Sequence, residues 1–349
     1  MSQLMPFDGN LITTGMGILP HKDMDRALRL AMSVDIPFWP QLPKMSFFED
    51  MYVQASENFP GIILEPENLN IYFDTTKFYS ELENTLANFE NPDFFRMSAK
   101  YSATYHAFLN YDFSKYIAIR GQLEGPVSFG LKVLDENKKP IIFNEEVRSI
   151  LFDFMSRKAN VQLKELKERH SKAFLFIDEP GLQYIFSSVS GYTNDMAKKD
   201  FEIFFNQIEH PRGIHLCGNP DWDFLLNLDI DILSFNAYNC GDIFVKYKAS
   251  IKRFLERGGI IGWGIVPANF DEFHKESQDG LIHHIETLWQ QLLKEGFDLE
   301  EMLRKSILMP ATCALLNPDE FKTVEKAYEW LKKISLRLRE KYDLIEKQF

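Results

Sequence analysis

The chain has 349 residues, of which 45% are hydrophobic, enough for one large domain with a full core. Lys and Arg number 39 against 51 Asp and Glu, so the net charge of −12 argues against a nucleic-acid-binding surface. Three cysteines form no disulfide framework, the N-terminus lacks a signal-peptide pattern, and no apolar run is long enough to span a bilayer. We therefore expect a cytoplasmic protein with no nucleic-acid partner and no membrane partner.

Short apolar segments alternate with longer amphipathic segments along the chain. The predicted strands are residues 11–14, 116–119, 173–177, 213–217, 231–235, 259–263 and 307–309. The predicted helices are residues 195–209, 222–228, 242–257, 280–295 and 323–346. Repeated strand–helix units, with strands that are apolar throughout, predict an α/β fold with a buried parallel sheet. A single (β/α)8 TIM barrel over residues 1–349 is the favoured closure; a doubly wound open sheet is the alternative, although no GxGxxG follows the first strand.

Residues 35–112 are less regular than the rest of the chain. Within them, residues 61–73 alternate in a way that predicts a β-hairpin. We interpret residues 35–112 as an insertion at the rim of the barrel.

A histidine and a cysteine two positions apart, His215 and Cys217, form the strongest candidate metal site. Residues i and i+2 of a strand point to the same face, so these two side chains can bind one ion if their segment is extended. Cys313 is a third candidate ligand. Two thiolates and an imidazole suit Zn²⁺, and three protein ligands leave one position open for substrate. The alternative interpretation is two small buried cysteines and a core histidine.

Other polar or unusual residues also follow the predicted strands, and the carboxyl ends of barrel strands are where active sites are built. Asp178 and Glu179 follow the strand at 173–177 and are candidate catalytic residues, although strand-end carboxylates also serve as helix caps. The further residues that follow strands are Gln122, Glu124, Ser128, Asn236, Trp263 and Cys313.

These segments, in this order, resemble the catalytic barrel of cobalamin-independent methionine synthase. That barrel belongs to a superfamily with uroporphyrinogen decarboxylase and the zinc methyltransferases that act on coenzyme M. The similar segments are Thr-Thr-Gly-Met-Gly-Ile-Leu-Pro (13–20), Glu-Gly-Pro-Val-Ser (124–128), Ile-Asp-Glu-Pro-Gly-Leu (177–182), His-Leu-Cys (215–217) and Cys313. The resemblance implies that His215, Cys217 and Cys313 bind zinc and that Asp178 binds an ammonium group or a donor proton. Gly17, Gln122, Glu124, Ser128, Asn236 and Trp263 are the substrate-binding candidates, and packing is the alternative role of Trp263.

The chain departs from the family pattern at two positions. Asn236 stands where the family places a zinc-binding glutamate, and a neutral amide is a poor zinc ligand. The fourth position is therefore left to water, to substrate or to Cys240. Ile18 replaces a serine that helps the synthases to hold the amino-acid carboxylate, which weakens the case for homocysteine.

The resemblance predicts a zinc-dependent methyltransferase that transfers a methyl group to homocysteine or another small thiol. The donor would be a corrinoid protein or another methyl carrier. Two alternatives stay open: an enzyme of the uroporphyrinogen decarboxylase type, and a non-catalytic zinc-binding paralogue. His21 and His106 are interpreted as structural or surface residues.

Overall fold

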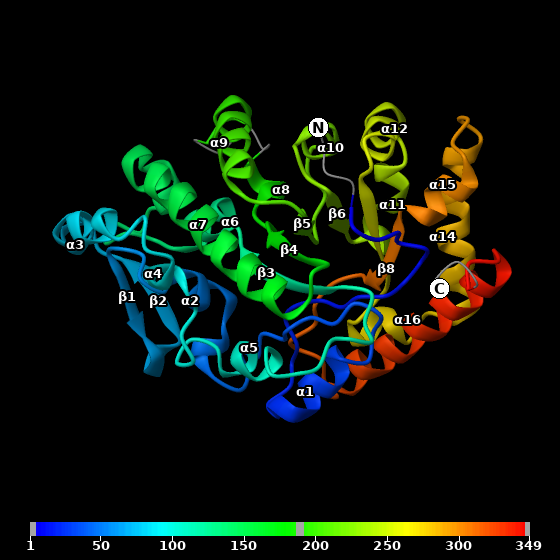
Figure 1. Cartoon of the computed structure of the whole chain (residues 1–349), viewed down its shortest axis with the longest axis horizontal. Coiled ribbons are helices and arrows are strands. Elements are labelled where there is room, and N and C mark those ends of the chain that lie inside the picture. Colours follow the sequence, from blue (N-terminus) through cyan, green and yellow to red (C-terminus); the bar gives the residue numbers. More distant parts are fainter. Residues whose placement is uncertain (1–4, 186–191, 346–349) are drawn as a thin grey trace.

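A curled, six-stranded parallel sheet with helices on its outer face forms the centre of the molecule (Figure 1). The computed structural model describes residues 5–185 and 192–345. The strands follow one another in chain order across the sheet, from β3 to β8. Their bounds are β3 (Ile119–Glu124), β4 (Ala173–Asp178), β5 (Arg212–Leu216), β6 (Ile232–Phe235), β7 (Ile260–Val266) and β8 (Ser306–Pro310).

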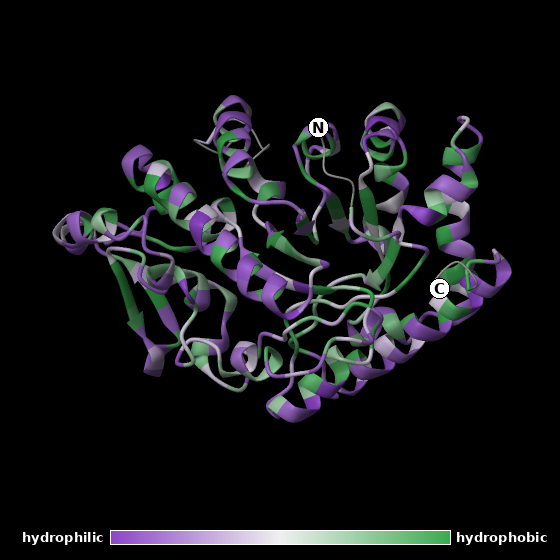
Figure 2. Ribbon diagram, viewed as in Figure 1, coloured by the Kyte–Doolittle hydropathy of each residue, from purple (hydrophilic) through white to green (hydrophobic). Residues whose placement is uncertain are grey.

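Polar caps define where many of the helices begin. Asp221 accepts a hydrogen bond from the Phe224 backbone N–H, and Ser277 accepts one from Gly280, which satisfies amides that a first turn leaves unpaired. Figure 2 shows that hydrophilic and hydrophobic residues alternate along these helices. The helices are α1 (Met24–Ala31), α2 (Met51–Ser56), α3 (Thr75–Ala87), α4 (Pro92–Phe95), α5 (Ala103–Phe108), α6 (Pro126–Lys132), α7 (Glu145–Arg169), α8 (Leu182–Ile185), α9 (Asn194–Gln207), α10 (Trp222–Asn227), α11 (Ala237–Phe244), α12 (Lys248–Glu256), α13 (Phe270–Phe273), α14 (Gln278–Leu293), α15 (Leu299–Arg304) and α16 (Lys322–Lys341).

Both faces of the sheet are buried, as its apolar strands predict. On the outer face, Leu175, Ile214 and Leu233 belong to the large cluster packed against the helices. On the inner face, Phe176 and Ile232 belong to a second, smaller cluster. Alternate residues of each strand therefore point either to the helices or into the space that the curled sheet encloses.

The predicted eight-stranded barrel is present only in part. The described residues form six regular parallel strands, and single pairs extend them at both edges. Thr13 bridges Leu308 of β8, the Ile36 N–H donates to the Thr13 carbonyl at 2.9 Å, and Phe38 bridges Arg120 of β3. The predicted strand at 11–14 is thus reduced to one bridge, because Asn10 and Leu11 have φ angles of 43° and 59°, which are incompatible with an extended strand.

Most of the other predicted elements lie within a few residues of their expected places, with two further errors. The strand predicted at 116–119 is wrong: β3 occupies Ile119–Glu124, so Gln122 and Glu124 lie in the strand rather than after it. Their polarity was mistaken for that of a loop, although both side chains are buried. The helix predicted at 242–257 is two helices, α11 and α12, which a turn at residues 245–247 separates.

The predicted hairpin is confirmed. Strands β1 (Ile62–Glu65) and β2 (Asn70–Phe73) are antiparallel, and a short 3-10 helix, η2 (Pro66–Asn68), joins them. Two further 3-10 turns, η1 (Phe47–Glu49) and η3 (Ile141–Phe143), complete the described elements. Figure 1 shows the hairpin on the left, below α3 and away from the six-stranded sheet.

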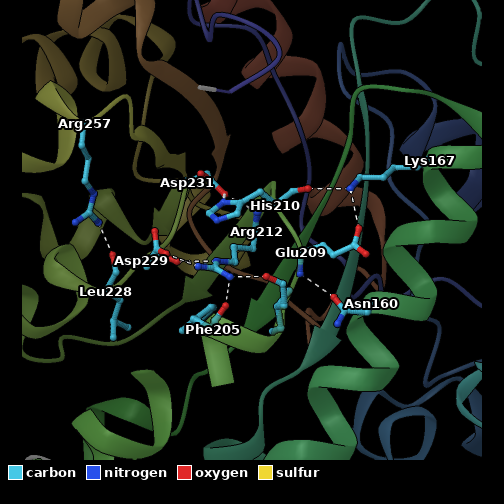
Figure 3. A network of polar contacts seen from close by, with 11 residues as sticks. Asn160, Lys167, Phe205, Glu209, His210, Arg212, Leu228, Asp229, Asp231 and Arg257 are labelled. Atoms are coloured by element: carbon cyan, nitrogen blue, oxygen red, sulfur yellow. Dashed lines mark hydrogen bonds and ion pairs between the residues drawn. The ribbon is translucent and has the colours of Figure 1, made fainter. Parts of the chain in front are cut away.

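The amino end of β5 is held by a network of polar contacts around Arg212 (Figure 3). The guanidinium of Arg212 donates to the carbonyls of Phe205 and Ile208, to the Asp229 carbonyl at 2.7 Å and to the Asp229 carboxylate at 2.6 Å. Asp231 accepts from the Arg212 backbone N–H at 2.8 Å and contacts His210 Nδ1 at 2.7 Å. This end of the sheet is therefore fixed by charge-assisted hydrogen bonds, which leaves the opposite end for a site.

Every helix in the described ranges is too short or too polar to cross a membrane.

Candidate metal and substrate site

The strand register gathers three of the predicted residues, and Ser234 beside them, at the carboxyl edge of the sheet. Glu124 pairs with Asp178, Asp178 with His215, and His215 with Ser234. Residues that pair in register on neighbouring parallel strands point to the same face, so these four side chains form one row across β3 to β6. The same strands contribute Phe176 and Ile232, two residues earlier, to the inner apolar cluster. The row therefore lies on the inner face, directly above that cluster.

His215 and Cys217 are in contact. The Nε2 atom of His215 lies 3.3 Å from the Cys217 sulfur, and the hydroxyl of Thr312 donates to the same sulfur at 3.3 Å. On the other side of the ring, Nδ1 lies 3.0 Å from the Ser234 hydroxyl oxygen. Ser234 in turn donates to the sulfur of Met309 at 3.0 Å.

This chain of contacts favours one position for the hydrogen of neutral His215. A thioether sulfur can only accept, so the single hydroxyl hydrogen of Ser234 is directed at Met309. The Ser234 oxygen is then free to accept from Nδ1–H. The lone pair of neutral His215 consequently lies on Nε2, the atom that faces Cys217. A hydrogen bond that sets the tautomer of a histidine in this way is typical of metal-binding histidines.

Both groups are neutral in the absence of a metal. Burial lowers the pKa of His215 to about 3, and the nearby Arg120 charge adds to this effect. Burial raises the pKa of Cys217 to about 12, and the Cys313 thiol raises it further while Thr312 opposes the shift. A metal ion that binds the nitrogen lone pair and the sulfur displaces the proton of the thiol, which becomes a thiolate ligand.

The pair fits two corners of a zinc site. Ligand bonds of about 2.0 Å to nitrogen and about 2.3 Å to sulfur at a tetrahedral angle separate the two ligand atoms by about 3.5 Å. The observed separation is 3.3 Å. Cys313 is close enough to affect the pKa of Cys217 and, like Cys217, is partly exposed. Within residues 5–185 and 192–345, however, no three His, Cys, Asp or Glu side chains are gathered closely enough to hold an ion together.

Cys240 lies on the first turn of α11. Its thiol is buried, and its sulfur approaches the carbonyl of Gly218 at 3.8 Å. Asn236 caps the same helix, because its side-chain oxygen accepts from the Asn239 N–H at 3.0 Å. The amide at the position of the family's glutamate is thus engaged in holding a helix end.

Asp178 lies next to a buried cation that the sequence analysis did not single out. Arg120 is 2% exposed and donates to Gln122 at 2.9 Å, to the Thr14 hydroxyl at 3.2 Å and to the Gly15 carbonyl. It forms no ion pair with any described carboxylate, and burial lowers its pKa to about 10. Burial raises the pKa of Asp178 to about 7, although Arg120 partly opposes this shift.

Glu179 holds a loop together. Its carboxylate accepts from the backbone N–H groups of Val127 and Ser128 at 3.0 and 2.8 Å and from the Ser128 hydroxyl at 2.6 Å. The Ser128 oxygen also accepts from the Gly181 N–H at 2.8 Å. Burial raises the pKa of Glu179 to about 7, while these hydrogen bonds lower it. Both carboxylate oxygens of Glu179 and the hydroxyl oxygen of Ser128 thus accept hydrogen bonds from protein groups. These bonds hold α6 against the end of β4.

Glu124 is the least satisfied group in the row. It is 1% exposed, and neither carboxyl oxygen has a hydrogen-bond partner of good geometry in the described residues. Burial and the neighbouring carboxylates Glu179 and Asp178 raise its pKa well above the usual range, while the nearby Tyr52 hydroxyl opposes the shift. An unpaired buried carboxyl group is costly, so it is a candidate for contact with a ligand.

The remaining predicted residues have structural contacts. Gln122 donates to the Trp39 carbonyl at 2.7 Å and lies against Gly17, where an added Cβ would come within 2.8 Å of its side chain. Trp263 points to the outer face of β7, donates to the Ser306 hydroxyl at 2.9 Å and packs against Phe244. The structure thus brings Asp178, His215, Cys217 and Glu124 to one edge and places Trp263 away from it. The sequence did not single out Arg120, Ser234, Met309 and Thr312. Arg120 and Ser234 lie an even number of positions before Glu124 and Asn236, and Thr312 is next to Cys313, so these three could have been found. No such signal marks Met309.

Comparison with known proteins supports the fold. No protein-family model matches the chain, and no curated protein matches it in sequence. A methyltransferase from Methanosarcina mazei superimposes with a TM-score of 0.54 at 13% identity, covering 96% of this chain and 94% of that one. A B12-independent methionine synthase from Shewanella sp. W3-18-1, solved in complex with selenomethionine, superimposes with a TM-score of 0.54 at 13% identity, covering 97% and 99%. Over nearly its whole length, this chain therefore has a methionine synthase-like fold that is also similar to that of a methyltransferase.

Proposed function

We propose that this chain is a zinc-dependent methyltransferase that transfers a methyl group to a small thiol. The observation that carries the proposal is the contact of His215 Nε2 with the Cys217 sulfur at 3.3 Å, with the Nε2 lone pair directed at that sulfur by Ser234. The methyltransferase and methionine synthase neighbours support the reaction class. In this proposal the single pairs at Thr13, Ile36 and Phe38 complete an eight-stranded barrel around the site.

His215, Cys217 and Cys313 would hold the ion. Zinc, when bound, lowers the pKa of a coordinated thiol, so that an acceptor is available as the thiolate that attacks an electrophilic methyl group. Cys217 and Cys313 lose their protons on binding the ion, because only thiolates are effective ligands. Cys313 has to approach the other two residues, since the three are not gathered closely enough in the described residues.

Asp178 is the residue best placed to handle a proton or a cationic group of the acceptor. It neighbours His215 in register, and its pKa of about 7 allows it to exist in both protonation states near neutral pH. Glu179 has a different role in this proposal. Its hydrogen bonds to Val127 and Ser128 position the end of β4, which Asp178 occupies, so Glu179 is a positioning residue.

Metal content tests the proposal most directly. Protein purified without added metal should contain close to one zinc per chain, and Cys217→Ser should reduce this severalfold. Addition of homocysteine, coenzyme M or a simple alkyl thiol to the zinc protein should release a proton near neutral pH, read with an indicator dye. Full zinc content in Cys217→Ser, or proton release that is unchanged in this variant, would contradict the proposal. Methyl transfer is then measured with methylcobalamin and with methyl-folate donors.

One observation favours a closed, non-catalytic zinc site as a second candidate. Asn236 supplies no carboxylate, and the Cys240 sulfur lies 3.8 Å from the carbonyl of Gly218, the residue after Cys217. X-ray absorption separates the two candidates. Three sulfurs and one nitrogen, unchanged by thiol and altered by Cys240→Ser, would indicate the closed site. Two protein sulfurs and a third sulfur that appears only with added thiol would indicate the catalytic one.

A further inference from the structure

The hairpin of β1 and β2 has one edge with no strand beside it in the described residues (Figure 1). The Phe73 N–H of β2 donates to the Leu134 carbonyl at 2.9 Å, and the next N–H, that of Asp74, donates to the Gly61 carbonyl at 2.9 Å. Successive N–H groups of a strand point to opposite edges, so Gly61 faces β2 and its neighbour Ile62 faces away from β2. β2 therefore lies between β1 and Leu134, and the unpaired edge is the outer edge of β1.

Ile62 and Leu64 carry the outward-facing backbone groups of this edge. Both residues are partly exposed, and in the described residues neither their N–H groups nor their carbonyls have a hydrogen-bond partner. The two residues are separated by about 6.8 Å, the repeat of two residues in an extended chain. Natural proteins often blunt such an edge with proline, lysine or a bulge, and Ile62–Glu65 contains none of these. The edge can therefore pair with the backbone of another extended segment.

A groove lies beside this edge, between β1 and α3. Its cavity of about 350 Å³ is within the range of pockets that bind ligands. Ile62 and Leu64 line the cavity, whereas Ile63 and Glu65, which alternate with them along the strand, do not. The two residues with unpaired backbone groups are thus the ones on the groove side of β1.

The groove suits an uncharged side chain. Phe59 and Phe94 line it together with the two β1 residues and supply apolar surface. On the α3 side, Lys77 donates to Glu81 at 2.7 Å, and Glu81 also accepts from the Gly61 N–H at 2.9 Å. These opposite charges satisfy each other, so neither of them requires a charged ligand.

The charge around the edge distinguishes between two possible occupants. Glu65 ends β1 and Glu67 lies on the turn that follows, and neither carboxylate forms an ion pair with any residue that the structure describes. The whole chain has a net charge of −12, so a second copy is repelled and a cationic partner is attracted. We propose that the outer edge of β1 and the groove beside it bind an extended peptide segment of another protein. This segment pairs with Ile62 and Leu64, places an uncharged side chain in the groove and carries a lysine or arginine next to Glu65.

Peptide display tests this assignment. A library of random peptides about seven residues long is selected on the full chain, and the selected peptides should contain apolar residues at alternate positions and a lysine or arginine near one end. Leu64→Pro removes the outward N–H and leaves the pairing of β1 with β2 in place, so fluorescence anisotropy should show about tenfold weaker binding of a labelled synthetic peptide. Leu64→Val keeps this N–H and is the matched control with nearly unchanged affinity. No selected peptide, or equal binding of every selected peptide to all three proteins, would overturn the proposal.

Methylated peptides provide a test that does not depend on a protein variant. A segment that adds to one edge pairs with β1 through the N–H groups of alternate residues only. N-methylation of the odd-numbered residues in one copy of the peptide and of the even-numbered residues in another should therefore abolish binding of one copy and change that of the other by less than about twofold. Equal loss in both copies would refute edge pairing. Sedimentation of the chain alone tests the other occupant: a dimer that Leu64→Pro dissociates would assign the edge to a second copy and overturn the proposal.

Discussion

Replacement of Gly125 by alanine tests whether Glu179 is a clamp. Gly125 has a φ of −78°, so alanine is acceptable to the backbone, but an added Cβ would lie 2.2 Å from the Glu179 Cδ and Oε1 atoms. An ordinary contact begins at 3.4 Å, so the carboxylate has to move by 1.2 Å, the difference between these two values. Its three hydrogen bonds, of 2.6 to 3.0 Å, cannot survive such a movement.

The expected loss of stability follows from those bonds. A hydrogen bond to a charged group contributes about 1.5–3 kcal/mol, so loss of at least two of the three predicts destabilisation by about 3–6 kcal/mol. Urea unfolding gives this value. In the background Glu179→Ala the clash is absent, so Gly125→Ala should cost less than about 1 kcal/mol there, and the double-mutant cycle should show a coupling of about 3 kcal/mol. Gly280→Ala is the matched control, because its Cβ would meet nothing closer than 3.2 Å. An equal cost of Gly125→Ala in both backgrounds would refute the clamp.

The remaining predictions concern the metal, the proton and the two ends of the sheet. Cys313→Ser should lower zinc content as Cys217→Ser does; an unchanged content measured by plasma emission would remove Cys313 from the site. Burial raises the folded pKa of Asp178 from 3.8 to about 7, so its contribution to stability falls as pH rises from 4 to 7, by up to about 4 kcal/mol. Asp178→Asn should therefore be more stable than wild type at pH 8 but little more stable at pH 4. An equal difference in the free energy of unfolding at the two pH values, measured with urea, would contradict this. Met309→Leu frees the Ser234 hydroxyl to donate to Nδ1 of His215, so chelator competition should show zinc affinity reduced about 10–100-fold, whereas no change would argue against the proposed tautomer. Arg212→Met removes the hydrogen bonds of the guanidinium to the carbonyls of Phe205, Ile208 and Asp229 and should destabilise the chain by about 1–3 kcal/mol without changing zinc content; a loss of zinc in folded protein would show that the two ends are coupled.

The sequence was most informative where a strand is apolar on both faces. Ala173–Asp178 is such a strand, and its position predicted that Asp178 would lie at the sheet edge. Prediction failed where polar residues are buried, because Arg120, Gln122 and Glu124 are hydrophilic in sequence yet lie inside β3. Arg120 donates to Thr14 and Gly15, and Gln122 donates to Trp39, all more than 80 residues away, and no local pattern reveals such partners.

The same limitation applies to the candidate site. His215 and Cys217 were identified from their spacing, which depends only on local strand geometry. The hydrogen-bond chain through Ser234 and Met309 depends on strand register, and register is a property of the whole sheet. The role of Glu179 was also hidden, because its partners Val127 and Ser128 lie about fifty residues earlier.

Arg120 places a buried positive charge inside a protein whose surface is acidic. The outside of the molecule carries an excess of acidic groups, so it repels anions that approach from solution. Within the sheet, the guanidinium of Arg120 forms no ion pair with a described carboxylate. Its charge affects the pKa values of both Asp178 and His215. Dissolved salt screens the exterior repulsion over about 10 Å at 0.1 M but hardly affects a buried charge. A negatively charged acceptor should consequently enter faster as ionic strength rises, while the stabilisation it finds inside stays the same.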